Sequence, residues 1–267
     1  MKIKYNNALV SALVIINLFL CLHIPNAICE EPIQLNTETE DIALTDDINI
    51  ARAQVAKYPN NVEAHFNLEI ALSRTSLVEE AIKELRKTKL LIRKPENSGI
   101  IDKKVSEYKE MLKNNPEAGN IKYRLAFSHY LKAYLTAKNL EKTKNNLKGK
   151  KAGKDKKSLD IFDPKRLLLI DKNPEIKENL ELSMSYFKDL IKSNPDDLWA
   201  KVYYAFILVE QYGDTEKARH LWNEVEKQNP NNPAPYLFLG ELHIKEGRLK
   251  EGILEISRAL LLRSQGY

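Results

Sequence analysis

The sequence predicts an all-α protein built from helix–turn–helix pairs and interrupted by one basic loop. Proline breaks recur along the chain, each between two runs with the apolar spacing of a helix, and proline ends one helix and sets up the next. Glycine is only 9 of 267 residues, which disfavours turn-dense β folds, and 43% hydrophobic with 30% charged residues is typical of a folded helical chain. The breaks are Tyr58-Pro59, Asn115-Pro116, Asn194-Pro195 and Asn229-Pro230.

The unit after the last break alternates large and small residues at fixed offsets. Small residues allow two helix backbones to approach, large ones fill the space around them, and Gly247 suits a left-handed turn between the helices. The pattern is formed by Tyr236, Leu239, Gly240, His243, Gly247, Gly252, Ile256 and Ala259.

This pattern resembles the tetratricopeptide repeat, a helix pair of 34 residues that stacks into a solenoid. The resemblance is strong over 196–263, moderate over 47–92 and 118–138, and poor between them, where residues 100–114 supply one helix instead of two. One departure is Phe206, which stands where the family prefers glycine. The resemblance implies a right-handed solenoid of about four repeat-like units and about ten helices.

The N-terminus has the layout of a secretory signal. Lys2 and Lys4 precede an uncharged stretch over 8–22, and the small residues Ala27 and Cys29 suit a cleavage site before Glu30. We therefore expect a signal peptide, or an uncleaved membrane anchor, over 1–29. An acidic linker over 30–46 follows, then irregular repeat-like helices over 47–138, a lysine-rich insertion over 139–174 and two repeats over 175–267.

Cysteine usage agrees with export. Both cysteines, Cys21 and Cys29, lie in or beside the signal-like segment, so the remaining chain has no disulfide and depends on its core. No Asn-x-Ser/Thr sequon occurs. We expect a bacterial periplasmic or cell-envelope protein.

The basic loop has three readings. It is a solvated loop, a contact for an anionic membrane or cell-wall surface, or a nucleic-acid contact, and export argues against the last. A phosphate loop is excluded, because three residues separate Gly149 from Gly153 and Asp155 replaces the Ser/Thr that would hold magnesium. The candidate residues are Lys148, Lys150, Lys151, Lys154, Lys156 and Lys157.

Catalytic and metal motifs are missing. The chain has no Gly-x-Ser-x-Gly turn and no His-Glu-x-x-His spacing. The acid pairs Glu79-Glu80 and Asp196-Asp197 stand where helices are expected to begin, a position that favours carboxylates. The sequence therefore predicts no enzyme activity, no metal and no cofactor.

The family resemblance implies a concave groove lined by the first helix of each repeat, whose fifth and ninth residues often meet ligand. An aromatic and aliphatic groove would suit a partner protein or peptide, whereas burial of the same rings in the core is the alternative. Only Asn67 and Arg124 lie near the slots of the family's terminal-carboxylate clamp, so no clamp of that type is expected. The candidate groove residues are Phe66, Tyr123, Phe127, Tyr130, Tyr203, Ile207, Leu237 and Glu241.

These observations predict a non-enzymatic exported adaptor that binds a partner protein or peptide through its groove. The alternative is a membrane-attached structural protein that contacts anionic surfaces through the lysine-rich loop.

Overall fold

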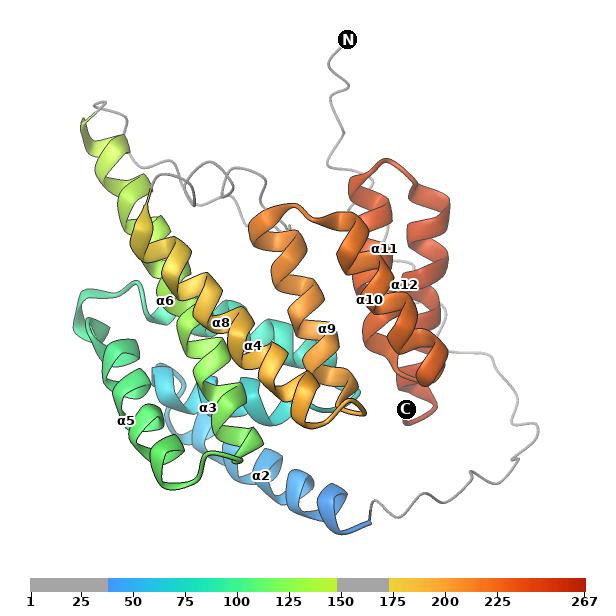
Figure 1. Cartoon of the computed structure of the whole chain (residues 1–267), viewed down its shortest axis with the longest axis horizontal. Helices are drawn as coiled ribbons and strands as arrows, with labels where there is room; N and C mark the ends of the chain where they lie inside the picture. Colours follow the sequence, from blue (N-terminus) through green and yellow to red (C-terminus); the bar gives the residue numbers. More distant parts are fainter. Residues whose placement is uncertain (1–37, 148–172) are drawn as a thin grey trace. The chain divides into compact units, whose positions relative to one another are not determined.

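A computed structural model describes residues 38–147 and 173–267, and this part of the chain forms ten α-helices (Figure 1). The fold described here is that of the compact unit that begins at residue 42 and ends at residue 267. The helices are α2 (Glu38–Lys57), α3 (Val62–Leu72), α4 (Val78–Leu91), α5 (Ile100–Asn114), α6 (Gly119–Leu147), α8 (Pro174–Ser193), α9 (Leu198–Ile207), α10 (Thr215–Gln228), α11 (Pro233–Lys245) and α12 (Leu249–Ser264). A 3₁₀ turn, η2 (Pro95–Asn97), precedes α5, and a π-helical turn, η4 (Leu208–Tyr212), continues α9.

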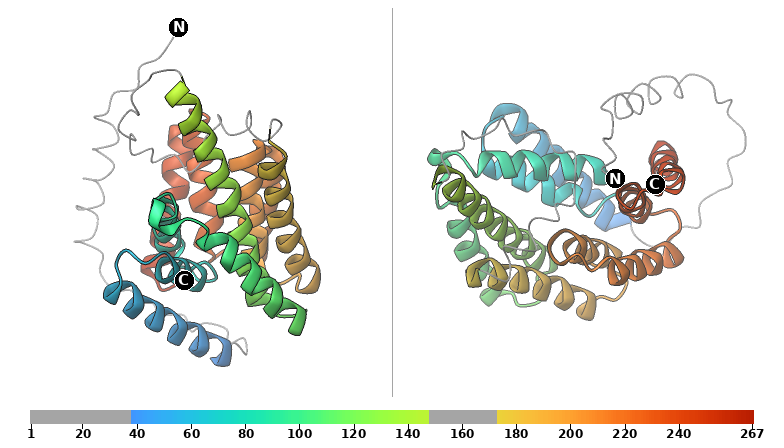
Figure 2. Two further views of the ribbon diagram at one scale, coloured as in Figure 1. Left: turned by 90° about the vertical axis from the view of Figure 1, so that its left-hand side faces the viewer. Right: turned by 90° about the horizontal axis from the view of Figure 1, so that it is seen from above.

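The helices pack as successive pairs, which confirms the predicted helix–turn–helix solenoid. The pairs are α3 with α4, α6 with α8, α9 with α10, and α11 with α12. Helix α5 packs on α6 without a second helix, as expected from residues 100–114. Helices α6 and α8 lie side by side although the insertion separates them in sequence (Figure 2).

The proline breaks end helices where predicted. Helices α2, α5, α8 and α10 end two residues before Pro59, Pro116, Pro195 and Pro230. Polar side chains then cap the next helix: Asn61 accepts from the backbone N–H of Ala64 at 2.9 Å, because the first turn of a helix has N–H groups without intrahelical partners. The same capping begins α8, α9, α10 and α11, at Asn173, Asp197, Asp214 and Asn232.

One continuous core runs through the pairs from α3 to α12, and a smaller cluster joins α2 to α3 and α4. Trp222 is fully buried, donates its indole N–H to the carbonyl of Val202 at 3.2 Å, and stacks on Phe238. Phe206, the residue in place of the family's glycine, packs its ring against Tyr130 and Phe238. Burial between neighbouring pairs therefore holds the fold.

Three helix ends lie inside segments expected to be linker or insertion. Helix α2 begins at Glu38, inside the expected linker, and α6 runs on to Leu147, inside the expected insertion. Helix α8 begins at Pro174, where Asn173 caps it and proline suits the first helical position. The expected signal segment and the six candidate loop lysines lie outside the described residues. Within the described ranges, no helix combines the length and apolarity needed to span a bilayer.

Candidate partner-binding hollow between α2, α3 and α6

A hollow of about 170 Å³ opens between α2, the C-terminal end of α3 and the start of α6. All of its lining residues belong to the unit 42–267. Four of them, Asp47, Ile50, Gln54 and Asn120, are exposed to solvent, so the hollow is accessible from outside. The hollow is lined by Asp47, Ile50, Ala51, Gln54, Asn67, Ile70, Ala71, Arg74, Asn120 and Arg124.

Two guanidinium groups line this hollow, and each lies over a tyrosine ring. The Arg124 guanidinium lies 5.7 Å from the centre of the Tyr108 ring and donates to Asn67 Oδ1 at 2.7 Å. The Arg74 guanidinium lies 5.5 Å from the centre of the Tyr123 ring. Because both side chains rest on aromatic faces, their orientation is largely set before any ligand binds.

Neither arginine has a carboxylate within ion-pair distance among residues 38–147 and 173–267; the acidic residue lining the same hollow is Asp47. The charge of Arg74 acts on the pKa of the Tyr123 hydroxyl. Burial and the Asp197 carboxylate raise the pKa of the Tyr123 hydroxyl well above its usual value, and Arg74 opposes that rise. The hollow therefore carries one positive charge in excess.

One side of the hollow is apolar. Ile50 of α2 is 59% exposed, Ala71 is half-buried and Ile70 is buried beneath them. An isoleucine so exposed beside two guanidinium groups gives a mixed apolar and cationic surface.

The residues predicted to line a concave groove lie mainly in the interior. Tyr123, Phe127 and Tyr203 surround Phe187 of α8, with ring centres 5.0 to 6.4 Å apart in four contacts. Tyr123 also donates to Asp197 Oδ1 at 2.6 Å. Phe66 is buried and stacks on Tyr108.

The remaining candidates follow the same trend. Ile207 and Leu237 are buried, Glu241 is half-buried, and Tyr130 is buried between α4 and the π turn η4. Seven of the eight candidates are thus buried, which favours the core alternative stated from the sequence. Their part in partner binding stays a prediction.

A buried polar network surrounds Tyr130. Lys89 of α4 hydrogen-bonds to the Tyr130 hydroxyl, which donates to Glu210 of η4, and the Lys89 ammonium lies 3.3 Å from the second Glu210 oxygen. The ammonium also lies over the rings of Tyr130 and Tyr134. This network joins three elements that are distant in sequence.

Glu69 of α3 is buried nearby without hydrogen-bond partners for either oxygen in the described structure. Burial raises the pKa of Glu69 well above its usual value, while the charge of Lys89 and the nearby Thr88 hydroxyl oppose the rise. The Tyr203 hydroxyl likewise has no partner in this part of the chain, and burial followed by the Glu69 charge raises its pKa. The raised pKa of Glu69 favours its protonated form.

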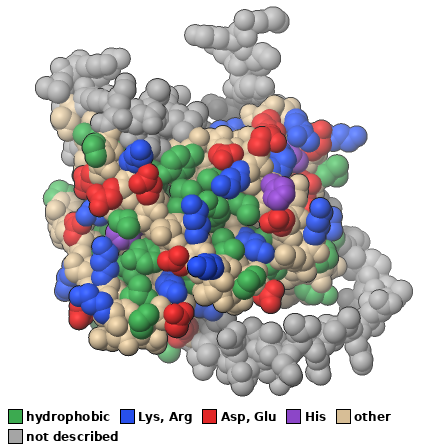
Figure 3. Space-filling view, viewed as in Figure 1, with side chains coloured by type: hydrophobic (Ala, Val, Ile, Leu, Met, Phe, Trp, Pro, Cys, Tyr) green, Lys and Arg blue, Asp and Glu red, His purple; other side chains and the backbone are tan. Residues whose placement is uncertain are grey.

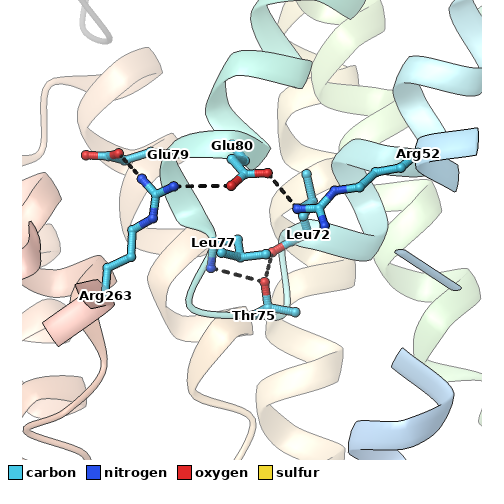
Figure 4. Close-up of polar contacts among 7 residues, drawn as sticks. All are labelled: Arg52, Leu72, Thr75, Leu77, Glu79, Glu80 and Arg263. Carbon is cyan, nitrogen blue, oxygen red and sulfur yellow. Dashed lines mark hydrogen bonds and ion pairs between the residues drawn. The ribbon is translucent and has the colours of Figure 1, made fainter. Parts of the chain in front are cut away.

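The predicted acid pairs lie at helix starts, as expected. Asp197 caps α9, and Glu79 and Glu80 lie in the first turn of α4. The latter two also bind the last helix: Arg263 of α12 lies 2.6 Å from Glu79 and 3.2 Å from Glu80 (Figure 4). The second Glu80 oxygen pairs with Arg52 of α2 at 2.8 Å.

The described residues contain no group of three or more His, Cys, Asp or Glu that could hold a metal. His129 is buried, with Nδ1 2.8 Å from Asn179 Oδ1 and its ring stacked on Tyr186. On the face shown in Figure 3, acidic and basic side chains are interspersed and do not form a single-sign area.

From the sequence, Asn67 and Arg124 were considered only for a terminal-carboxylate clamp, which was not expected. Ile50, Gln54 and Arg74 were missed because they lie at no groove position of the repeat pattern. Helix α2 carries apolar residues on more than one face, so no signal in the sequence singled out Ile50.

No protein-family model matches the chain, and no curated protein matches it. Among solved structures, the crystal structure of MamA aligns with 89% of this chain and 98% of its own, at 13% sequence identity and a TM-score of 0.34. A likeness this loose transfers neither a partner nor an activity.

Proposed function

We propose that this protein is a non-enzymatic helical-repeat scaffold that holds a segment of a partner protein in the hollow between α2, α3 and α6. The observation that carries the proposal is the accessible hollow itself, with an exposed isoleucine beside two arginines that lack carboxylate partners in the described ranges. Stacked helix pairs present such surfaces on a rigid frame. The site differs from the aromatic row expected from the sequence, because those rings fill the core.

A site-specific photocrosslinker tests this function. We would place it at Gln54 and Asn120, which line the hollow, and at Lys250 of α12 as the control, and expose each variant to envelope extract. A partner crosslinked from Gln54 and Asn120, but not from Lys250, is the expected result. Ala71→Trp should abolish the crosslink by filling the hollow, with circular dichroism confirming the fold. Crosslinking that persists in this variant would exclude the hollow.

Export is a further part of the proposal. It is supported by the charged start, the apolar stretch over 8–22 and the lack of cysteine after Cys29. Expression with a C-terminal tag, followed by fractionation and N-terminal sequencing, tests it. A product found outside the cytoplasm, and starting near Glu30 if the segment is cleaved, is expected; an intact chain in the cytoplasm would contradict export.

The alternative role, attachment to an anionic membrane or cell-wall surface, depends on the six candidate lysines over 148–157. Sedimentation with vesicles of 30% phosphatidylglycerol, compared with neutral vesicles, tests it. Binding that falls with salt and disappears when 148–157 is deleted would support the surface role, because exposed charges are screened by salt.

A further inference from the structure

We infer that the hollow recognises an acidic segment of its partner, with side-chain carboxylates held by Arg74 and Arg124 and an aliphatic side chain resting on Ile50 and Ala71. This inference rests on the proposed function and names the chemistry of the partner.

Arg74 and Arg124 both retain hydrogen-bond donors for a ligand. Arg124 donates one N–H to Asn67 Oδ1. Arg74 contacts the ring of Tyr123 but forms no ion pair within the described residues. A guanidinium has five N–H donors in a planar fork, so both retain donors for a ligand. The stacking on Tyr108 and Tyr123 reduces the side-chain entropy that binding would otherwise cost.

The hollow favours a carboxylate over a phosphate backbone as its anionic ligand. A planar fork matches a carboxylate with two parallel hydrogen bonds, and such charge-assisted bonds are about twice as strong as neutral ones. The exposed amides of Gln54 and Asn120 add further donors at the rim. Asp47 and the apolar surface of Ile50 disfavour a phosphate backbone, which needs a continuous run of positive charge.

The volume of the hollow limits how much of a partner can enter it. A cavity of about 150 Å³ takes one benzene-sized molecule, so the 170 Å³ hollow admits one or two side-chain ends and not a whole helix. The occupant is therefore a short acidic and aliphatic motif presented by a partner, with the rest of that segment lying over the rim.

Selection from a displayed library of random twelve-residue peptides tests the inference without a known partner. The full chain is the bait, and peptides that bind the Ala71→Trp variant equally well are discarded. We expect the remaining peptides to be enriched in Asp or Glu next to Leu, Ile or Val. An enriched peptide and its Glu→Gln analogue are then compared by fluorescence anisotropy.

The expected result is at least a tenfold loss of affinity for the Glu→Gln analogue, and a similar loss for Arg74→Gln/Arg124→Gln. Arg248→Gln, which removes one positive charge at the start of α12, away from the hollow, should bind as the wild type does. Arg74→Lys should retain part of the affinity, and melting temperatures should show that all variants are folded.

Two outcomes separate the inference from the proposed function. The selection could yield peptides that need the hollow but contain no acidic residue, or the Glu→Gln analogue could bind as well as its parent peptide. Either result would overturn the acidic specificity but not the scaffold function. Failure to recover any peptide sensitive to Ala71→Trp would overturn both. A single-stranded oligonucleotide that binds through the same two arginines would also overturn the inference.

Discussion

Gly240 of α11 and Gly252 of α12 face each other so closely that neither position has room for a methyl group. A Cβ at position 240 would lie 2.9 Å from the carbonyl oxygen of Gly252, and one at position 252 would lie 2.7 Å from that of Gly240. The last helix pair is therefore in backbone contact at this crossing, which is the physical reason for the small residues noted in the sequence.

Gly240→Ala and Gly252→Ala should each lower the free energy of unfolding by about 1 to 3 kcal/mol, because the new methyl group must push the two helices apart. Urea denaturation monitored by circular dichroism measures the change. Ser257→Ala, at an exposed position of α12, is the matched control and should change stability little. Wild-type stability in both glycine variants would show that α11 and α12 are less closely packed.

Much of the fold was predictable because it depends on local signals. The proline breaks, the helix caps and the left-handed Gly247, with φ of +84°, follow from preferences within a few residues, and the structure confirms them. The candidate site was harder to predict from the sequence. The repeat pattern specifies which face of a helix is apolar but not which neighbour covers it, and Phe187 of α8 covers Tyr123, Phe127 and Tyr203.

Substitutions at Tyr203 distinguish a core ring from a groove ring. Tyr203→Phe should leave stability unchanged or slightly raised, because the hydroxyl is buried without a hydrogen-bond partner in the described chain. Tyr203→Ala should cost about 3 to 5 kcal/mol through the cavity it leaves. Chemical denaturation compares the two, and a stable Tyr203→Ala variant that loses partner binding would restore the groove reading.

The raised pKa of Glu69 gives the stability of the fold a pH dependence with a definite sign. Since the folded-state pKa of Glu69 is raised, its contribution to stability is present below the ordinary carboxyl pKa and is lost as pH rises towards the folded-state value. Glu69→Gln removes this loss, so the variant should gain on the wild type as pH increases from 4 to 8. Urea midpoints at several pH values test it, with Glu117→Gln, on an exposed turn, as the control. A constant difference across this range would contradict a raised pKa for Glu69.

The Lys89–Glu210 pair should show strong coupling. Lys89→Met alone leaves the Glu210 carboxylate buried without its ammonium partner and should cost about 3 to 5 kcal/mol. The double variant Lys89→Met/Glu210→Gln should recover a large part of that loss, because it also removes the buried carboxylate charge that had faced the Lys89 ammonium. A double-mutant cycle from unfolding curves measures the coupling, and additive losses would mean that the two groups act independently.

The ion pairs of Arg263 with Glu79 and Glu80 change how this solenoid should open. In most stacked-repeat proteins each unit touches only its neighbours, so the end units fray first and separately. Here the last helix is fastened to the first complete pair, 184 residues away in sequence. Each such pair is worth only about 0.2 to 1 kcal/mol, so the opening of α12 costs about this much more for each contact that it loses with α4. The openings of the last helix and of the first complete pair should therefore be weakly coupled, and amide protons at both ends should exchange with solvent more slowly than in a solenoid whose ends do not touch.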